Sequence, residues 1–172
     1  MKSILKKLGL ETKVLTGIHP ERKLQVMDSQ YETLYQSINK LAATITSTPL
    51  AMITFYNEQH VWVESDAIKS DTLQYTHNET FYNWAITNKE YIEISDTSLI
   101  SDQGPHALNR YYPNLKFYAG VPLKLPLGEV IGVLSVFDIK PNSMNPHQKS
   151  ILVALADVVA KSMVFKHHLI MN

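Results

Sequence analysis

The stretch Asn114–Pro141, NLKFYAGVPLKLPLGEVIGVLSVFDIKP, carries the strongest structural signal in the chain. Two apolar runs, Phe117–Leu125 and Val130–Phe137, flank the short break Pro126-Leu127-Gly128-Glu129. A turn-forming proline and a flexible glycine between two apolar runs are typical of a β-hairpin. The sequence therefore predicts two antiparallel strands joined by a tight turn in this stretch.

The predicted hairpin has no polar face. Successive strand residues point to opposite faces, so Phe117, Ala119, Val121 and Leu123 share one face, and Tyr118, Gly120, Pro122 and Lys124 share the other. Both faces are mainly apolar, and we therefore expect other elements to cover both of them. The small residues Ala119, Gly120 and Gly132 would leave room for another group beside the backbone. We expect the hairpin to form one wall of a pocket.

Several pieces of the chain follow one another in an order that resembles a known family. They are RKLQVMD at 22–28, TSTPLAMITFYNEQHVWVES at 46–65, FYNWAI at 81–86, YIEISDTS at 91–98, FYAGVPL at 117–123, GEVIGVLSVFDIKP at 128–141 and QKSILVALADVVA at 148–160. Together they resemble GAF domains, the small-molecule sensor modules of signalling proteins. The resemblance spans roughly residues 22–168, which is nearly the whole chain.

The resemblance implies an α+β fold with α/β/α layers. A mainly antiparallel sheet of five to six strands would have the terminal helices on one face and a pocket layer of loop and short helix on the other. We expect residues 1–19 to be a lead-in segment and residues 20–172 to form one domain, a usual size for a single domain. The lead-in segment is open to three interpretations: a frayed terminus, packing against a partner chain, or contact with a membrane surface.

Outside the hairpin, apolar periodicity predicts the remaining elements. Helices are expected at 30–46, at 81–86 and from Pro146 onward, and strands at 50–56, 61–64 and 91–94. The polar stretch 96–113 has no clean periodicity, so we expect a long connection there, of the kind that is usually functional or mobile. The apolar stripes Leu34–Ile45 and Ile151–Met163 are expected either to cover the sheet or to form a dimer seam, as terminal helices do in GAF domains.

Composition excludes several classes of function. Lys plus Arg equals Asp plus Glu at 16 each, so no overall field draws the chain to nucleic acid or to an anionic membrane. No apolar run is long enough to cross a bilayer, and the N-terminus lacks the features of a signal peptide. We therefore expect a cytoplasmic protein that binds neither nucleic acid nor membrane.

The chain contains no cysteine, which removes disulfides, thiolate metal sites and cysteine nucleophiles. Many GAF domains attach a tetrapyrrole to a cysteine where this chain has Tyr82, so the resemblance implies no covalent chromophore here. Free methionine sulfoxide reductases share the fold but use cysteines as reductants. An enzyme of that kind is therefore disfavoured. Only fragments of the cyclic-nucleotide signature are present, Asn88-Lys89 and Phe137-Asp138.

The residues expected to contact a ligand lie in the segments that should converge over the open face of the sheet. They are Tyr82, Trp84, Asp96, His106, Arg110, Tyr118 and Ser135. The planar guanidinium of Arg110 suits a carboxylate, phosphate or nitrate-like anion, and His106 would share its face if the segment coils. A surface ion pair of Arg110 with an aspartate is the structural alternative.

Aromatic side chains are the second group of residues that could line the predicted pocket. Tyr82, Trp84 and Tyr118 suit a planar or cationic ligand, but such rings more often fill the core or plug the cavity. Ser135 stands where the family often has a cysteine, and Asp96 serves either the pocket rim or the local turn. The histidines show no metal-ligand spacing, and no serine has a nucleophile-elbow sequence around it. We expect no metal and no catalytic residue, and the sequence leaves any cofactor unidentified.

These patterns favour a non-catalytic cytoplasmic sensor or regulatory domain. It would bind a small molecule or anion, form a homodimer, and signal through a partner protein. The alternative is a protein-interaction or dimerisation module whose pocket is filled by its own aromatic side chains.

Overall fold

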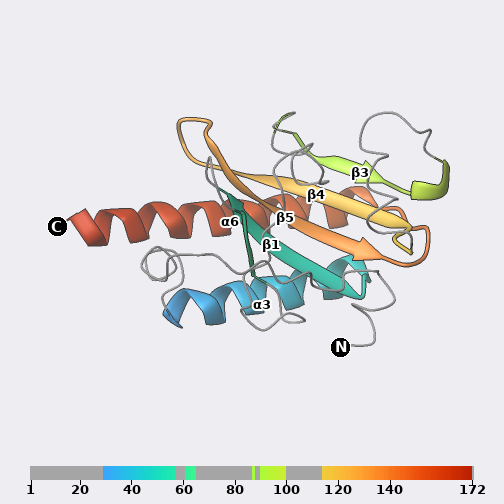
Figure 1. The fold of residues 1–172 in the computed structure, drawn as a ribbon, viewed down its shortest axis with the longest axis horizontal. Coiled ribbons are helices and arrows are strands. Elements are labelled where there is room, and N and C mark those ends of the chain that lie inside the picture. The colour runs from blue at the N-terminus through green and yellow to red at the C-terminus, as the bar shows by residue number, and fades with distance from the viewer. Residues whose placement is uncertain (1–28, 57–60, 65–86, 88–89, 100–113, 172) are drawn as a thin grey trace.

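The computed structural model describes residues 29–56, 61–64, 87, 90–99 and 114–171. In this part of the chain, five strands form one antiparallel sheet in the order β2-β1-β5-β4-β3 (Figure 1). The elements are α3 (Ser29–Thr46), β1 (Leu50–Tyr56), β2 (Val61–Glu64), β3 (Ile92–Ile94), the 3-10 turn η1 (Thr97–Leu99), β4 (Phe117–Lys124), β5 (Val130–Asp138) and α6 (Pro146–Met171).

The hairpin β4–β5 forms where the apolar runs predict it. Gly128 in its turn has φ of 84°, a conformation that glycine adopts without a steric penalty. The Leu125 N–H donates to Glu129 O, and the Gly128 N–H donates to Leu125 O, each at 2.8 Å. At the far end of β5, the carboxylate of Asp138 accepts the Lys140 N–H at 3.1 Å and turns the chain away. The predicted hairpin is confirmed.

One face of the sheet carries the main core, together with α3 and α6. The core residues are Tyr35, Ile38 and Ala42 of α3, Ala51, Ile53 and Phe55 of β1, Phe117, Ala119, Val121 and Leu123 of β4, Leu134 and Val136 of β5, and Met144, Leu152, Ala156, Val159 and Ala160 in and before α6. The expectation that both terminal helices cover the same face is confirmed (Figure 1).

The two helices lie antiparallel to each other. Tyr35 near the start of α3 meets the middle of α6 through the Ser162 hydroxyl at 3.3 Å, and Gln148 at the start of α6 donates to Ile45 O at 2.9 Å. Asn145 and Gln148 cap α6 reciprocally, each side chain accepting the other residue's N–H at 2.9 and 3.0 Å. Pro146 follows as the first helical residue, where its missing N–H costs nothing.

The apolar stripes of the helices are only partly buried. Leu41 and Val158, which the stripes include, are 46% and 48% exposed. On α6 the fully buried positions are Leu152, Ala156, Val159 and Ala160, of which only Val159 belongs to the expected stripe. The side of α6 that packs against the sheet is therefore rotated from the side that the spacing of leucine and isoleucine predicts. The predicted lead-in 1–19, the helix at 81–86 and the pocket layer on the other face lie outside the described residues.

Gly132 of β5 lies where the β1 backbone passes closest. A Cβ placed on it would stand 2.2 Å from Thr54 O and 2.9 Å from Leu123 Cδ1. The first contact is with backbone, which cannot rotate away as a flexible side chain can. Gly132 therefore permits close approach of β1 and β5, and the room expected beside its backbone is taken up by the neighbouring strand.

We predict that Gly132→Ala lowers the free energy of unfolding by about 3 kcal/mol, because the added methyl overpacks a fixed contact. Urea denaturation followed by circular dichroism measures this loss. Gly128→Ala is the matched control. A Cβ at Gly128 meets nothing within 4 Å. This variant should therefore lose only about 1 kcal/mol of unfolding free energy, because alanine disfavours the positive φ of that position. A G132A protein as stable as G128A would contradict this account of the β1–β5 contact.

Candidate functional site

The sheet face turned away from α3 and α6 is buried as well. The strand registers place on it Leu50, Met52 and Thr54 of β1, Ile92 and Ile94 of β3, Tyr118, Gly120 and Pro122 of β4, and Val133, Ser135 and Phe137 of β5. None of these side chains carries a charge. Their polar groups are hydroxyls, so these side chains can offer hydrogen bonds but no ion pair, and Lys124, the exposed last residue of β4, alternates onto the same face.

Tyr118 and Ser135 meet on this face. Both side chains are fully buried, with 3.2 Å between the Tyr118 hydroxyl and Ser135 Oγ. The Tyr118 ring packs against Phe137, with 5.4 Å between ring centroids and a tilt of 59°. Burial raises the pKa of Tyr118, and the hydrogen bond with Ser135 opposes that shift only in part. Both hydroxyls are therefore protonated at physiological pH.

The space beside Gly120 is filled by Tyr118. A Cβ on Gly120 would stand 2.3 Å from the Tyr118 hydroxyl and 3.2 Å from Val133 Cγ1. Tyr118 lies two residues earlier on the same face of β4, and its ring leans along the strand over the glycine. The room expected beside the backbone at Gly120 is therefore present, but the Tyr118 side chain takes it up. The small residue instead accommodates the tyrosine of its own strand.

Asp96 has a local hydrogen-bonding role. It follows β3, and its Oδ1 accepts the Ser98 N–H at 2.8 Å where η1 begins. Hydrogen bonds from Ser98 lower the pKa of Asp96. The interpretation of Asp96 as a turn-forming residue is confirmed, and its role at a pocket rim remains a prediction. The other predicted ligand contacts, Tyr82, Trp84, His106 and Arg110, lie outside the described residues. The structure thus brings together Tyr118 and Ser135.

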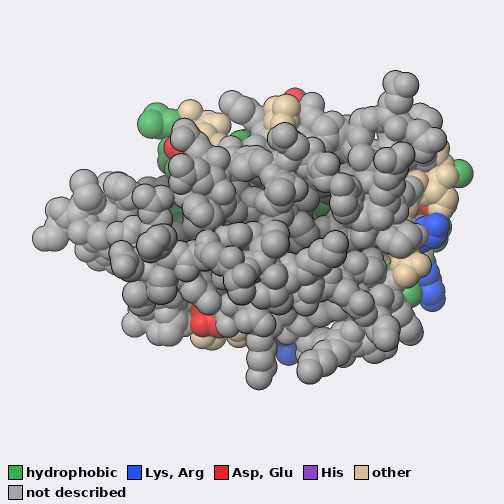
Figure 2. Space-filling view, in the orientation of Figure 1, with side chains coloured by type: hydrophobic (Ala, Val, Ile, Leu, Met, Phe, Trp, Pro, Cys, Tyr) green, Lys and Arg blue, Asp and Glu red, His purple; other side chains and the backbone are tan. Residues whose placement is uncertain are grey.

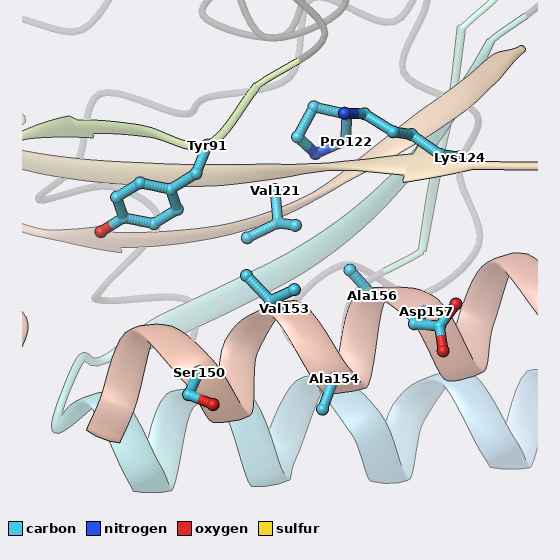
Figure 3. A pocket seen from close by; sticks show the side chains of 9 residues that line it. All are labelled: Tyr91, Val121, Pro122, Lys124, Ser150, Val153, Ala154, Ala156 and Asp157. Carbon is cyan, nitrogen blue, oxygen red and sulfur yellow. The ribbon is translucent and has the colours of Figure 1, made fainter. Parts of the chain in front are cut away.

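A groove of about 420 Å³ lies on the opposite, helix-bearing side of the sheet, between β4 and α6 (Figure 3). Val121 and Val153 point toward each other across it, with Lys124 and Asp157 at one end. The remaining lining residues are Tyr91, Pro122, Ser150, Ala154 and Ala156. Asp157 is bonded to Lys161 at 2.6 Å, one turn along α6. The groove is open and mainly apolar, and the sequence analysis did not predict it.

Glu93 joins β3 to the start of α6. Its carboxylate accepts the Tyr91 hydroxyl and the Met144 N–H, the latter at 3.1 Å, and lies 2.8 Å from Lys149 Nζ. Lys149 Nζ also lies 5.4 Å from the centre of the Tyr91 ring. Burial would raise the pKa of Glu93, but the bonds from Lys149, Tyr91 and Met144 outweigh it and hold that pKa below its usual range.

Neither a metal site nor a membrane span is found in the described part of the chain. No group of three or more His, Cys, Asp or Glu residues there could hold a metal ion. No helix there is both long and apolar enough to cross a bilayer. In Figure 2, the described lysine and carboxylate side chains in view lie at separate points around the rim of the molecule. Such scatter agrees with the equal numbers of acidic and basic residues in the sequence.

Comparison with known proteins tests the resemblance. The family model of the GAF domain matches residues 30–163, which include every strand of the sheet and most of both helices. The chain belongs to the GAF domain family.

Individual proteins agree with this assignment. The chain is similar to a cyclic di-GMP phosphodiesterase of Pseudomonas aeruginosa, with 27% identity over 119 residues, 69% of this chain. It spans only about a fifth (20%) of that relative's length. The GAF domain of a Coxiella burnetii phosphoenolpyruvate-protein phosphotransferase superposes with a TM-score of 0.67 at 12% identity, covering 88% of this chain and 92% of that one.

A type II free methionine-R-sulfoxide reductase from Thermoplasma acidophilum has the same fold. Its TM-score is 0.63 at 13% identity, covering 78% of this chain and 93% of that one. At such low identity the likeness extends to the fold alone. The GAF domain described here contains no cysteine.

The Glu93 cluster of this GAF domain was not found from the sequence. Glu93 and Lys149 are far apart in the chain, and nothing local marks a charged residue inside an apolar strand as paired. One local feature could have indicated it. Glu93 lies between two buried isoleucines in a short strand, and a carboxylate in that position needs a partner on its own face of the sheet.

We predict that Glu93→Gln lowers the free energy of unfolding by about 1–2 kcal/mol at pH 7, because a charge-assisted bond to Lys149 is lost. The folded-state pKa of Glu93 is depressed, so its stabilisation is present above the unfolded value of about 4.3 and disappears as pH falls through the folded value. The difference in unfolding free energy between the wild-type protein and E93Q should therefore become smaller below about pH 4. Urea denaturation at pH 7, 4 and 3 measures it.

Asp157→Asn is the control for this experiment, because it removes the exposed ion pair with Lys161, expected to contribute about 0.3–0.5 kcal/mol. Two results would contradict this role of Glu93. One is a loss of unfolding free energy in E93Q no larger than the loss in D157N. The other is an E93Q loss of the same size at pH 7 and at pH 3.

Proposed function

We propose that this GAF domain is a non-catalytic sensory or regulatory domain that binds a small molecule on the sheet face bearing Tyr118 and Ser135. The observation that carries the proposal is the buried, neutral hydroxyl pair on that face. Its neighbours Gly120, Val133 and Phe137 contribute no acid, base or nucleophile. Such a surface supports recognition by hydrogen bonding and ring contact rather than bond breaking.

The setting that we propose is cytoplasmic signalling. Family membership and the similarity to part of a cyclic di-GMP phosphodiesterase support a place in a signalling system. The proposal does not extend to that relative's hydrolytic activity, because the chain spans so little of its length. A ligand would favour one of two states of the domain, and a partner protein would respond to the favoured state.

A second candidate function is an interaction module with a self-filled pocket. It is favoured by the position of the Tyr118 hydroxyl, which takes up the space beside Gly120. In that case the tyrosine would be a permanent part of the core, and no ligand would exchange with it.

A ligand screen separates the two candidates. We expect at least one member of a set of cyclic nucleotides, amino acids, 2-oxo acids and nitrate to raise the melting temperature of the wild-type protein. Ser135→Ala should reduce that rise, because it removes one hydroxyl of the pair and otherwise changes little volume. Differential scanning fluorimetry, with native mass spectrometry to confirm stoichiometry, measures both. No response to any compound would support the self-filled module and overturn the sensor.

We further propose that the domain forms a homodimer through α3 and α6. Leu41 and Val158 are large apolar side chains left about half exposed on these adjacent helices, and burial against a second copy would remove them from water. Leu34 of α3 and Leu155 of α6 are also only partly buried.

We expect Val158→Glu and Leu41→Glu to convert the dimer to a monomer, because each places a charge in the proposed seam. Light scattering coupled to size-exclusion chromatography measures the mass. Val153→Glu is a matched control. Val153 is equally exposed, at 46%, but lies in the β4–α6 groove. If V153E dissociates the dimer while V158E does not, the interface is the groove side of α6.

A further inference from the structure

Thr54 is an unusual residue of the uncharged sheet face. Its side chain is 1% exposed, yet Oγ1 has no hydrogen-bond partner within the part of the chain that the structure describes. Thr46 shows the usual behaviour of a buried threonine, since its hydroxyl donates to Ala42 O at 2.7 Å and lies 2.9 Å from Thr48 Oγ1. A buried hydroxyl without a partner costs about 1–3 kcal/mol and calls for an explanation.

The register places Thr54 close to the Tyr118–Ser135 pair. Thr54 lies opposite Val133, and Met52 lies opposite Ser135, so Thr54 and Ser135 are diagonal neighbours on the same face. Such neighbours are about 7–8 Å apart at their Cα atoms, too far for a direct bond between short side chains. One polar atom between them could bond both hydroxyls, since two hydrogen bonds of about 2.8 Å reach about 5.6 Å and each side chain covers part of the remaining distance between the Cα atoms.

The chemistry of this face restricts what that atom belongs to. The hydroxyls of Thr54, Ser135 and Tyr118 come from the adjacent strands β1, β5 and β4. Around them lie Val133 and the Phe137 ring, and none of these groups carries a charge. An anion held here would lose its hydration without gaining a counter-charge from these strands, which is costly. A neutral molecule with hydrogen-bonding edges and a flat apolar surface fits better.

We infer that Thr54 is a specificity-determining residue that hydrogen-bonds an uncharged heterocycle held between the Thr54 and Ser135 hydroxyls. This inference rests on the proposed sensory function and narrows its ligand class. Because Thr54 is buried in this structure, a ligand reaches it after a local rearrangement over this face. The unsatisfied hydroxyl destabilises the unliganded state, and the bound state removes that cost, which gives the differential affinity that a sensor needs.

The first experiment needs no ligand. Thr54→Val replaces the hydroxyl with a methyl of similar size, so it should raise the melting temperature of the unliganded protein by removing an unsatisfied group. Thr46→Val is the matched control and should lower the melting temperature, because it breaks bonds to Ala42 and Thr48. A T54V protein destabilised as much as T46V would overturn the inference, since Thr54 would then be satisfied within the unliganded protein.

The second experiment uses adenine, uracil and nicotinamide as neutral probes, and nitrate and 2-oxoglutarate as anionic ones. We expect a neutral probe to bind the wild-type protein in isothermal titration calorimetry, and T54V to weaken it at least fivefold. A neutral probe that binds T54V equally well would overturn the role of Thr54. Binding of the anions alone would overturn the inference and leave the sensory function standing. No binding by any probe would overturn the inference, and only failure of the wider screen would also overturn the sensor.

Discussion

The burial of both faces of β4 and β5 is the constraint on which the rest of this domain depends. These two strands lie inside the sheet, flanked by β1 and β3, and almost every side chain between Phe117 and Phe137 on them is shielded from water. A hairpin of this kind cannot be stable alone, because neither face can be left in solvent. On one face α3 and α6 supply the apolar side chains that cover it, and on the other the strands present a second apolar surface.

The two faces differ in their chemistry, and the difference assigns their roles. On the helix face the core is aliphatic and aromatic, and the carboxylate of Glu93 beside it is bonded by Lys149, Tyr91 and Met144. That cluster ties the edge strand to the beginning of the long helix. On the other face the buried polar groups of the described strands are hydroxyls, so the recognition that we propose there depends on hydrogen-bond geometry. β3 contributes to both surfaces, with Ile92 and Ile94 on this face and Glu93 on the helix face.

Tyr118 shows how one side chain serves both stability and recognition. Its ring packs on Phe137 and over Gly120, which explains why that position has no side chain. Its hydroxyl meets Ser135, where burial keeps it protonated. The Tyr118 ring thus covers part of this sheet face, and its hydroxyl is one of the polar groups on the same face. The sensor and the self-filled module are therefore closely related states of one arrangement, separated by whether Tyr118 is displaced or retained.

The order of strands and helices could be predicted because each element is specified locally. Alternating apolar residues predict β4 and β5, proline and glycine the turn between them, and three- and four-residue spacing α3 and α6. The local role of Asp96 was likewise interpreted correctly, since its carboxylate accepts a backbone N–H two residues ahead. The groups that lie beside Gly120 and Gly132 could not be predicted, because the positions of the Tyr118 hydroxyl and Thr54 O depend on rotamer and strand register. The pairing of Glu93 with Lys149, the exposed arc of α6 and the unsatisfied Thr54 hydroxyl also arise between segments far apart in the chain. Local sequence patterns predict which side chains are buried. Tertiary packing determines which groups they contact, and no short stretch of sequence contains that information.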